Sequence, residues 1–227
     1  MFFFGPSANS MKELCDNLKI KGYIKSDNVY NAMLQVDRAD FTKRSPYQDR
    51  PQPINYNVTI SAPHMHAYCL ELLKDHLKEG GKALDIGFGS GYLTVAMSKM
   101  MKDKGVVVGI EHIKELCNFA MENISKNHKN LLDSKKLILI EGDGRKGYKE
   151  LGPYNCIHVG AAAPEVPKSL IEQLAGGGRL VIPVGPQGDS QYIYIIDKDK
   201  NGKISQRREL GVSYVPLTSV NQQLKGY

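Results

Sequence analysis

Three acidic side chains in this sequence could together bind one cationic, hydroxyl-rich ligand. Asp85, Glu111 and Asp143 each lie near or just beyond the carboxyl end of a short apolar run that indicates a β-strand. In parallel α/β folds such strand ends meet at one edge of the sheet, where ligands bind. Glu111 stands twenty positions beyond Gly91, a spacing typical of the carboxylate that binds a cofactor ribose. An exposed loop acid is the simpler interpretation of each one alone, but three in register favour a binding site.

A glycine-rich turn follows the first acid and predicts a cofactor on its backbone. Gly87, Gly89 and Gly91 alternate with larger residues, and glycine permits both positive φ and a close approach to a ligand. The dinucleotide fingerprint G-x-G-x-x-G fails, because its third glycine position, counted from Gly87, holds Tyr92. Asp85 would also repel a pyrophosphate. S-adenosyl-L-methionine fits better, since it carries a sulfonium and an ammonium but no phosphate.

A second reactive stretch is Thr59-Ile-Ser-Ala-Pro-His-Met-His66, where a β-branched run changes into a helix start. We expect Ser61 to be the helix N-cap and Pro63 to lie in the first turn. A free helix N-terminus offers unpaired N–H groups and a positive dipole end to a carboxylate. The alternative is that Ser61 is only a cap, and the local sequence does not decide between the two. His64 and His66 have no third ligand nearby, so we expect no metal site.

Composition and charge favour one globular domain without a nucleic-acid or membrane partner. The 227 residues, of which 41% are hydrophobic and 24% charged, are enough to bury a full core. The net charge is +6, but the basic residues are scattered, so solvated faces explain most of it. The four cysteines form no C-x-x-C pair, which indicates neither zinc nor disulfides. No apolar run approaches membrane-spanning length, and the Met1-Phe-Phe-Phe-Gly start is too short for a signal sequence, so we expect a cytoplasmic protein.

The order of the predicted elements favours a doubly wound, Rossmann-like α/β fold. Two amphipathic helices, starting at a capping box at Ser10 and near Ser26, come before any strand. Over residues 82–185 strand and helix patterns alternate strictly, which predicts a mostly parallel sheet. Two strands over 192–196 and 210–216, joined by an Asn-Gly turn, should form an antiparallel hairpin at the sheet edge.

The segment between the second helix and the first reactive strand predicts a lid. Residues 39–57 show little periodicity and contain three prolines and several aromatic side chains. Structureless segments of that length in compact domains are usually functional, so we expect an ordered lid or wall over the ligand. We expect the whole chain, 1–227, to be a single domain. It divides into N-terminal helices with the lid-like segment (1–57), a catalytic core (58–218) and a tail (219–227).

Several motifs spread over nearly the whole chain point to one family. They are Thr59-Ile-Ser-Ala-Pro-His-Met-His66, Ala83-Leu-Asp-Ile-Gly87, Gly142-Asp-Gly-Arg145, Ile157-His-Val-Gly-Ala-Ala-Ala-Pro164, Gly177-Gly-Arg-Leu180, Pro183-Val-Gly-Pro186 and Tyr214-Val-Pro-Leu-Thr218. Together they resemble the protein-L-isoaspartate (D-aspartate) O-methyltransferases, and the first and fourth are the most specific. Two residues depart from the family pattern: Phe88 replaces a small residue and could crowd the methionyl end of the cofactor, and Glu111 replaces an aspartate but keeps its ribose chemistry.

The resemblance implies methyl transfer from S-adenosyl-L-methionine to the α-carboxylate of L-isoaspartyl residues, with D-aspartyl residues left open. The ester then collapses to a succinimide, whose hydrolysis restores some normal aspartate. The implied partners are age-damaged proteins and peptides, and we expect a monomer. Ser61 is the residue implied in catalysis. The implied cofactor contacts are Val58, Thr59, Ile60, Ser61 and His66 along the cleft, Asp85, Gly87 and Gly89 at the methionyl part, Glu111 and His112 at the ribose, Asp143 and Gly144 at the adenine edge, and Thr218 closing the site.

The chemistry agrees with this interpretation, and three alternatives remain beside it. A carboxylate acceptor is already ionised at neutral pH, so its methylation requires positioning rather than a general base. A nicotinamide oxidoreductase is disfavoured by Asp85 and by the missing third glycine. An RNA or small-molecule methyltransferase is slightly favoured by the basic pI but lacks a base-flipping motif. A non-catalytic module that kept the cofactor fold is the third alternative.

Overall fold

The computed structural model describes residues 8–186 and 188–225. The described residues do not include the Met1-Phe-Phe-Phe-Gly start, which we expect to be too short for a signal sequence. They also do not include residues 226–227 of the predicted tail. The helices are α1 (Met11–Ile20), α2 (Asp27–Leu34), α3 (Pro63–Leu73), α4 (Tyr92–Met100), α5 (Lys114–Asn127), α6 (Lys129–Asp133), α7 (Lys168–Glu172) and α8 (Val220–Gln223), with short 3-10 turns η1 (Arg38–Asp40), η2 (Gly144–Lys146) and η3 (Lys149–Leu151). The strands are β1 (Gln52–Pro53), β2 (Thr59–Ile60), β3 (Lys82–Ile86), β4 (Val106–Glu111), β5 (Leu137–Glu141), β6 (Tyr154–Val159), β7 (Leu174–Val184), β8 (Gln191–Lys198) and β9 (Ile204–Val212).

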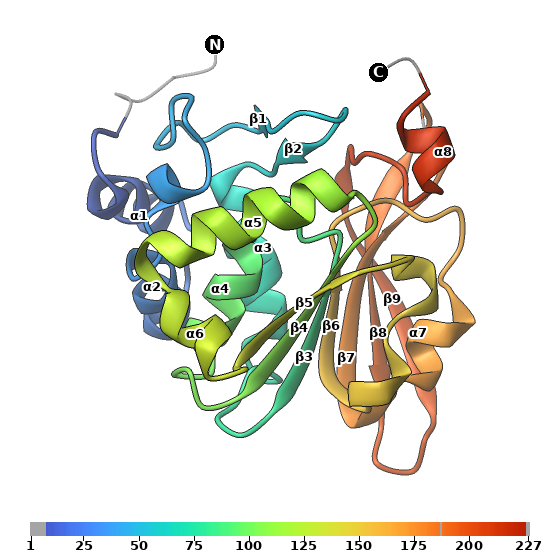
Figure 1. The fold of residues 1–227 in the computed structure, drawn as a ribbon. Coiled ribbons are helices and arrows are strands. Elements are labelled where there is room, and N and C mark those ends of the chain that lie inside the picture. Colours follow the sequence, from blue (N-terminus) through green and yellow to red (C-terminus); the bar gives the residue numbers. More distant parts are fainter. Residues whose placement is uncertain (1–7, 187, 226–227) are drawn as a thin grey trace.

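One seven-stranded sheet organises the molecule, in the order β5-β4-β3-β6-β7-β8-β9 (Figure 1). Neighbouring strands from β5 to β7 run parallel, whereas β8 is antiparallel to both β7 and β9. The chain builds outward from β3 to β5 and then crosses back to β6 on the other side of β3. This reversal beside β3 is a topological switch point, where α/β folds bind ligands. The predicted doubly wound fold with an antiparallel C-terminal hairpin is confirmed.

Alternating side chains of the central strands build a core on each face of the sheet. Ala83 of β3 packs with one cluster that draws on helices α1 to α6, and Leu84 packs with a second cluster that includes Leu170 of α7. Figure 1 shows the same division, with α7 on the opposite side of the sheet from α3, α4 and α5. Successive strand residues point to opposite faces, so a strand buried on both faces must be apolar nearly throughout. Such strands were recognisable in the sequence for this reason.

The last strand lies elsewhere in the sequence than expected. β9 spans Ile204–Val212, whereas the sequence predicted a strand over 210–216. An edge strand exposed to water carries polar and charged residues, here including Arg207 and Arg208, and these hide the apolar alternation. Residues 213–218 leave the sheet, and Pro216 forms an isolated parallel bridge to Ala162. The departing segment thereby returns to the carboxyl edge of the parallel strands.

Several hydrogen bonds tie residues 8–57 together and to the rest of the described chain. Ser10 caps α1 by accepting the Glu13 N–H at 3.2 Å, as its capping box predicts. Ser26 is the N-cap of α2 as expected, but it donates to Glu71 of α3 instead of capping the helix with its side chain. Within residues 39–57, Gln52–Pro53 form β1, which pairs antiparallel with β2 just beyond this segment. The segment that was expected to lack regular structure therefore contains a short strand. Its Tyr47 hydroxyl donates to Asp37 at 2.9 Å.

Candidate active site

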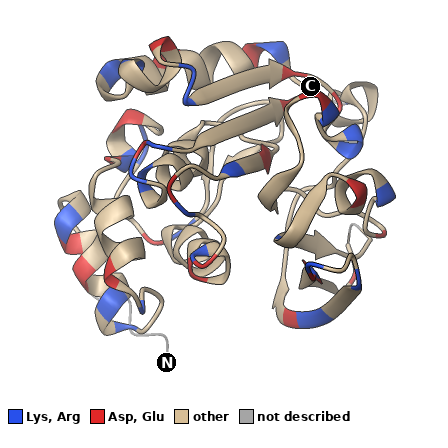
Figure 2. Cartoon of the chain, turned by 90° about the horizontal axis from the view of Figure 1, so that it is seen from below, with Lys and Arg blue, Asp and Glu red and all other residues tan. Residues whose placement is uncertain are grey.

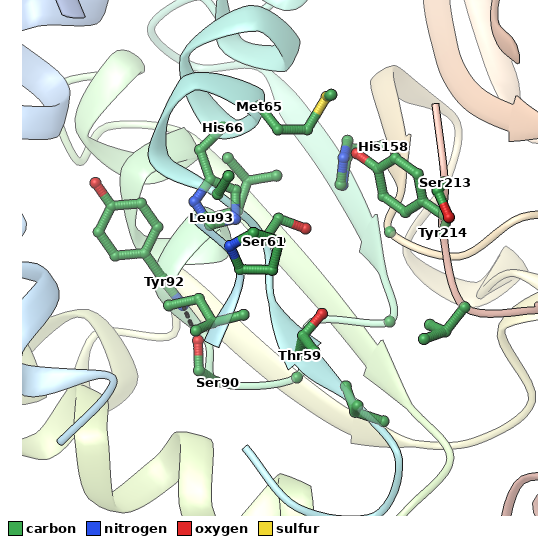
Figure 3. A pocket seen from close by; sticks show the side chains of 18 of the residues that line it. Thr59, Ser61, Met65, His66, Ser90, Tyr92, Leu93, His158, Ser213 and Tyr214 are labelled. Atoms are coloured by element: carbon green, nitrogen blue, oxygen red, sulfur yellow. Dashed lines mark hydrogen bonds between the residues drawn. The ribbon is translucent and has the colours of Figure 1, made fainter. Parts of the chain in front are cut away.

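A cavity of about 860 Å³ opens at the carboxyl end of β3, and we call it the main cleft. Its walls come from β2, the start of α3, the glycine turn after β3, and the loops after β6 and β9. In Figure 3 Thr59 and Ser61 lie on one side of this cavity, and His158 and Tyr214 lie on the other. The predicted site residues that line the main cleft are Val58, Thr59, Ile60, Ser61, His66, Asp85, Gly87 and Gly89.

The other predicted site residues surround smaller hollows that adjoin the main cleft. Glu111, His112, Gly144 and Thr218 line a pocket of about 50 Å³, which we call the side pocket. Val58 and Gly87 line both cavities, so the two lie next to each other. Thr218 does not lie on a strand as predicted, because it follows β9 and donates its hydroxyl to Gln222 in α8. Asp143 lines a third hollow that shares His112 with the side pocket.

The glycine turn adopts the predicted backbone geometry. Gly87, Gly89 and Gly91 have φ of 73°, 51° and 87°, values that favour glycine. Not all three glycines are needed to admit a ligand. A Cβ on Gly91 would stand 2.9 Å from the Ile124 side chain of α5, so this glycine permits helix packing. Gly87 lines both the main cleft and the side pocket, which leaves its backbone open to a ligand.

Phe88 lines the main cleft, but it is only 5% exposed and most of its side chain is packed inside the protein. Its side chain is buried and packs against Cys117 and Ala120 of α5 and Leu139 of β5. A Cβ on Gly109 of β4 would meet the Phe88 ring at 2.7 Å. The absent side chain at position 109 therefore provides the room for the larger residue in the turn.

Asp85 and His158 form a buried ion pair at the floor of the main cleft. The His158 Nδ1 lies 2.8 Å from Asp85 Oδ1, and Thr94 of α4 donates to Oδ2 at 2.7 Å. Burial alone lowers the pKa of His158, but hydrogen bonds with Asp85 and Cys69 outweigh it and raise this pKa to about 10. The imidazole is therefore protonated at neutral pH. A protein cation thus already partners one oxygen of Asp85, the acid that the sequence assigns to the methionyl part of the cofactor.

Glu111 binds the glycine turn and its own following loop from the side pocket. Its Oε1 accepts from the His112 N–H at 2.8 Å and the Ile113 N–H at 3.2 Å, and its Oε2 accepts from the Gly89 N–H at 3.2 Å. Burial raises the pKa of Glu111, while His112 and these N–H groups oppose the rise. A carboxylate oxygen can accept two hydrogen bonds, so Oε2 retains capacity for a ligand hydroxyl.

Asp143 is occupied by a neighbouring side chain. Arg145 donates to it from Nε at 2.9 Å and from Nη2 at 2.8 Å. This bidentate pair lowers the pKa of the Asp143 carboxyl.

The start of α3 is organised differently from the expectation. Ala62 is the N-cap instead of Ser61, and Pro63 follows in the first turn. The His64 N–H donates to Asp49 Oδ1 at 2.9 Å, and the His64 Nδ1 lies 2.8 Å from the same oxygen. Since proline has no N–H and Asp49 takes that of His64, the expected free helix N-terminus is wrong. Ser61 precedes the helix and directs its hydroxyl into the cavity (Figure 3).

Arg38, which the sequence did not single out, holds the Ser61 stretch from behind. It is fully buried, and its Nη2 donates to the Ser61 carbonyl at 2.7 Å. Its Nη1 lies 3.3 Å from His66 Nδ1, and its guanidinium lies 5.6 Å from the ring centre of Tyr92. A guanidinium only donates, so Nδ1 of His66 must accept. Burial and the Arg38 charge both lower the pKa of His66 well below its usual value, so His66 is neutral.

Other residues that sequence reasoning missed line the same walls. Burial and the nearby Cys69 raise the pKa of Tyr214 well above its usual value, so its phenol stays protonated and can donate. Gln191 accepts the Tyr214 N–H at 2.6 Å and holds that segment in place. A signal existed for His158, which is a titratable residue inside the apolar run of β6. Arg38 gave no such signal, because it stands in a polar stretch typical of solvent-exposed residues.

This arrangement suits group transfer between two bound organic ligands. The main cleft has the size of small-molecule sites, combining apolar walls with a few convergent polar groups. Within residues 8–186 and 188–225, no three His, Cys, Asp or Glu side chains are grouped as metal ligands. In the same part of the chain, no helix is both long enough and apolar enough to span a membrane.

Comparison with known proteins finds one family that matches the chain. The model of the protein-L-isoaspartate(D-aspartate) O-methyltransferase family matches residues 9–222. The chain is 52% identical over 217 residues to the protein-L-isoaspartate O-methyltransferase of Caenorhabditis elegans, covering 96% of each chain. It is 48% identical over 228 residues to protein-L-isoaspartate O-methyltransferase 1 of Arabidopsis thaliana, covering 99% of this chain and 98% of the relative.

A solved structure agrees over the fold as well. It comes from Plasmodium falciparum and is described as a protein-L-isoaspartate O-methyltransferase in complex with S-adenosyl-L-homocysteine. It superposes with a TM-score of 0.87 at 43% identity, covering 93% of this chain and 99% of that one. Sequence, fold and cleft therefore agree, and the chain belongs to the protein-L-isoaspartate(D-aspartate) O-methyltransferase family.

Proposed function

We propose that this enzyme transfers a methyl group from S-adenosyl-L-methionine to the α-carboxylate of L-isoaspartyl residues in damaged proteins. One observation carries the proposal: a single cleft is lined both by the glycine turn after β3 and by the Ser61 hydroxyl. The first can hold a cofactor backbone and the second can align an acceptor. The family match and the relatives' names support the same activity.

The residues present fit S-adenosyl-L-methionine. The side pocket offers the buried Glu111 carboxylate to ribose hydroxyls, and Gly87, without a side chain, lines both cavities. We propose that Asp85, Gly87 and Gly89 hold the methionyl part. Asp85 can still receive an ammonium beside His158, because each carboxylate oxygen accepts more than one hydrogen bond. When bound, the cofactor supplies an activated methyl group on a sulfonium.

The protein's own task is alignment of the acceptor. An ionised carboxylate needs no general base. The neutral His66 and Tyr214 therefore need not accept or release a proton during the transfer. We propose that the Ser61 hydroxyl donates to one acceptor oxygen while the other faces the methyl group. Holding reacting groups at near-attack distance can supply on the order of 7–11 kcal/mol. Arg38 donates to the Ser61 carbonyl at 2.7 Å and so fixes the backbone that carries the Ser61 hydroxyl.

The chemistry of the product explains a repair role. In an isoaspartyl residue the main chain continues through the side-chain carbonyl and leaves the α-carboxylate free. After methylation, the next backbone nitrogen attacks the ester and displaces methanol to form a succinimide. Water then opens the succinimide to aspartate or isoaspartate. A normal aspartyl residue presents its carboxylate one methylene out of register, and misplacement by about 1 Å can cost a hundredfold in rate.

A transfer assay with labelled methyl groups tests the proposal. The acceptors are an isoaspartyl peptide, its aspartyl twin and an RNA, each offered with S-adenosyl-L-methionine. We expect base-labile methyl ester on the isoaspartyl peptide alone. Label in RNA would instead support the nucleic-acid alternative, and equal label in both peptides would remove the isoaspartyl assignment.

We further propose a cytoplasmic monomer that binds neither nucleic acid nor membrane. Basic and acidic residues are interspersed over helices and strands in Figure 2 rather than gathered into a single-sign face, which disfavours a polyanion surface. The exposed edge strand β9 carries Arg207, Arg208 and Glu209, and charges of this kind oppose edge-to-edge pairing.

A further inference from the structure

A basic cluster stands beside the entrance of the main cleft. Lys43, Arg44 and Arg50 are exposed on the segment between η1 and β1. Arg44 and Arg50 line a hollow of about 490 Å³ together with Ser45 and residues 51–53, and we call it the basic hollow. Pro51 also lines the main cleft. The hollow therefore adjoins the cavity in which the acceptor residue would lie.

The acids of the same segment leave these cations without partners. Asp37 accepts from the Tyr47 hydroxyl at 2.9 Å, Asp40 accepts from the Asn127 amide at 2.8 Å, and Asp49 is held at the start of α3. In the described part of the chain, no carboxylate lies within ion-pair distance of the three basic residues. Within the described residues, the guanidinium groups of Arg44 and Arg50 therefore have no direct carboxylate partner where they line the hollow.

The acids of the main cleft itself do not cancel this charge. Asp85 is 1% exposed and paired with His158. Asp189, the other carboxylate in the lining, lies in the loop between β7 and β8 and comes from a different wall. A polypeptide that enters the main cleft beside Pro51 therefore passes the guanidinium groups of Arg44 and Arg50, which line the adjoining hollow.

We propose that the basic hollow binds an aspartate or glutamate side chain of the substrate, close in sequence to the methylated residue. The inference rests on the proposed function and names the substrate class within it. An acceptor residue held in the main cleft continues into chain on both sides, and one side passes over the rim at Pro51. Guanidinium groups pair with carboxylates through two parallel hydrogen bonds. The enzyme therefore prefers isoaspartyl sites with acidic neighbours.

The size and salt dependence of this preference follow from the exposure of the cations. Exposed ion pairs are weak, and each corresponds to about a twofold to fivefold change in affinity. Two such pairs acting independently should give a preference of about fourfold to twenty-fivefold. Exposed charges are screened within about 3 Å at 1 M salt, so the preference should vanish there.

The experiment compares kcat/KM for two isoaspartyl peptides that differ only in glutamate or glutamine at the flanking positions. The wild type is measured beside Arg44→Gln/Arg50→Gln. Lys200→Gln/Lys203→Gln serves as a control, because it removes the same charge from the exposed turn between β8 and β9. We expect the wild type and the control to favour the glutamate peptide at low salt, and the arginine variant to lose that preference.

Two results would overturn the inference and can be told apart. Equal kcat/KM for the two peptides in the wild type, or an unchanged preference in the arginine variant, removes the basic hollow and leaves the proposed function intact. Absence of methylation on both peptides removes the proposed function, and the inference fails with it.

Discussion

At the scale of single residues, the sequence identified those site residues whose place follows from the regular spacing of strands and turns. Glu111 and Gly89 contact each other because strand, turn and next strand recur at a fixed interval. Arg38 could not be predicted, since its partner Ser61 lies 23 positions away and only the folded chain brings them together. Asp49 was missed for the same reason. The N-cap role of Ser61 was wrong by one residue, which is the ordinary uncertainty of helix boundaries.

Arg38 should act as a positioning residue for the acceptor. Arg38→Lys keeps the positive charge but cannot reach both the Ser61 carbonyl and the His66 ring, and a displaced Ser61 would lower kcat/KM by about a hundredfold. Binding of S-adenosyl-L-homocysteine, measured by calorimetry, should change little, because Arg38 lines neither the main cleft nor the side pocket.

A separate readout distinguishes positioning from general loss of structure. Burial and the Arg38 charge lower the pKa of His66, so Arg38→Met should raise this pKa, as followed by NMR titration of the imidazole. An unchanged His66 pKa together with full activity in Arg38→Lys would contradict the assignment.

At the scale of elements, the inner strands were predictable and the exposed ones were not. β3, β4 and β6 are buried on both faces and so read as apolar runs, whereas β9 is solvent-exposed and was placed too late in the sequence. The Phe88 side chain illustrates the same limit. Its fit depends on Gly109 in the neighbouring strand, and no pattern within the turn itself reveals that pairing.

The wall formed by residues 39–57 should depend on Asp49. Its carboxylate accepts from both the N–H and the ring of His64, so Asp49→Ala removes the cap of α3 and one tether of the wall. Loss of a helix cap costs about 0.5–2 kcal/mol. We expect faster tryptic cleavage after Lys43 and Arg44 in this variant, and a rise in KM for the peptide. Cleavage at the wild-type rate would show that the wall is held by other contacts.

At the scale of the whole molecule, the fold class followed from the alternation of strands and helices, but the cleft did not. Strand order brings the ends of β3 and β6 side by side, with His158 beside Asp85. These residues are 73 positions apart, so their pairing is a property of the sheet. The sheet thereby places a buried ion pair between two central strands. The stability of the protein should therefore depend on the protonation state of His158.

The stability of the protein should depend on pH through this pair. The pKa of His158 rises from 6.5 to about 10 on folding. The stabilisation is therefore fully present below pH 6.5 and is lost as the pH rises through about 10. We expect the melting temperature of the wild type to fall more steeply between pH 7 and 10 than that of Asp85→Asn, which lacks the charged partner. Parallel curves for the two proteins would refute a protonated His158.

The most direct test of the account is the effect of Ser61→Ala on two quantities measured together. One is kcat/KM for methyl transfer to an isoaspartyl peptide and to its aspartyl twin, and the other is the affinity for S-adenosyl-L-homocysteine. We assign the Ser61 hydroxyl to aligning the α-carboxylate of the isoaspartyl acceptor. We therefore predict that the wild type methylates only the isoaspartyl peptide. Ser61→Ala should reduce that transfer by about a hundredfold while cofactor affinity changes by less than about threefold. Full activity in Ser61→Ala, or equal wild-type rates on the two peptides, would contradict the account.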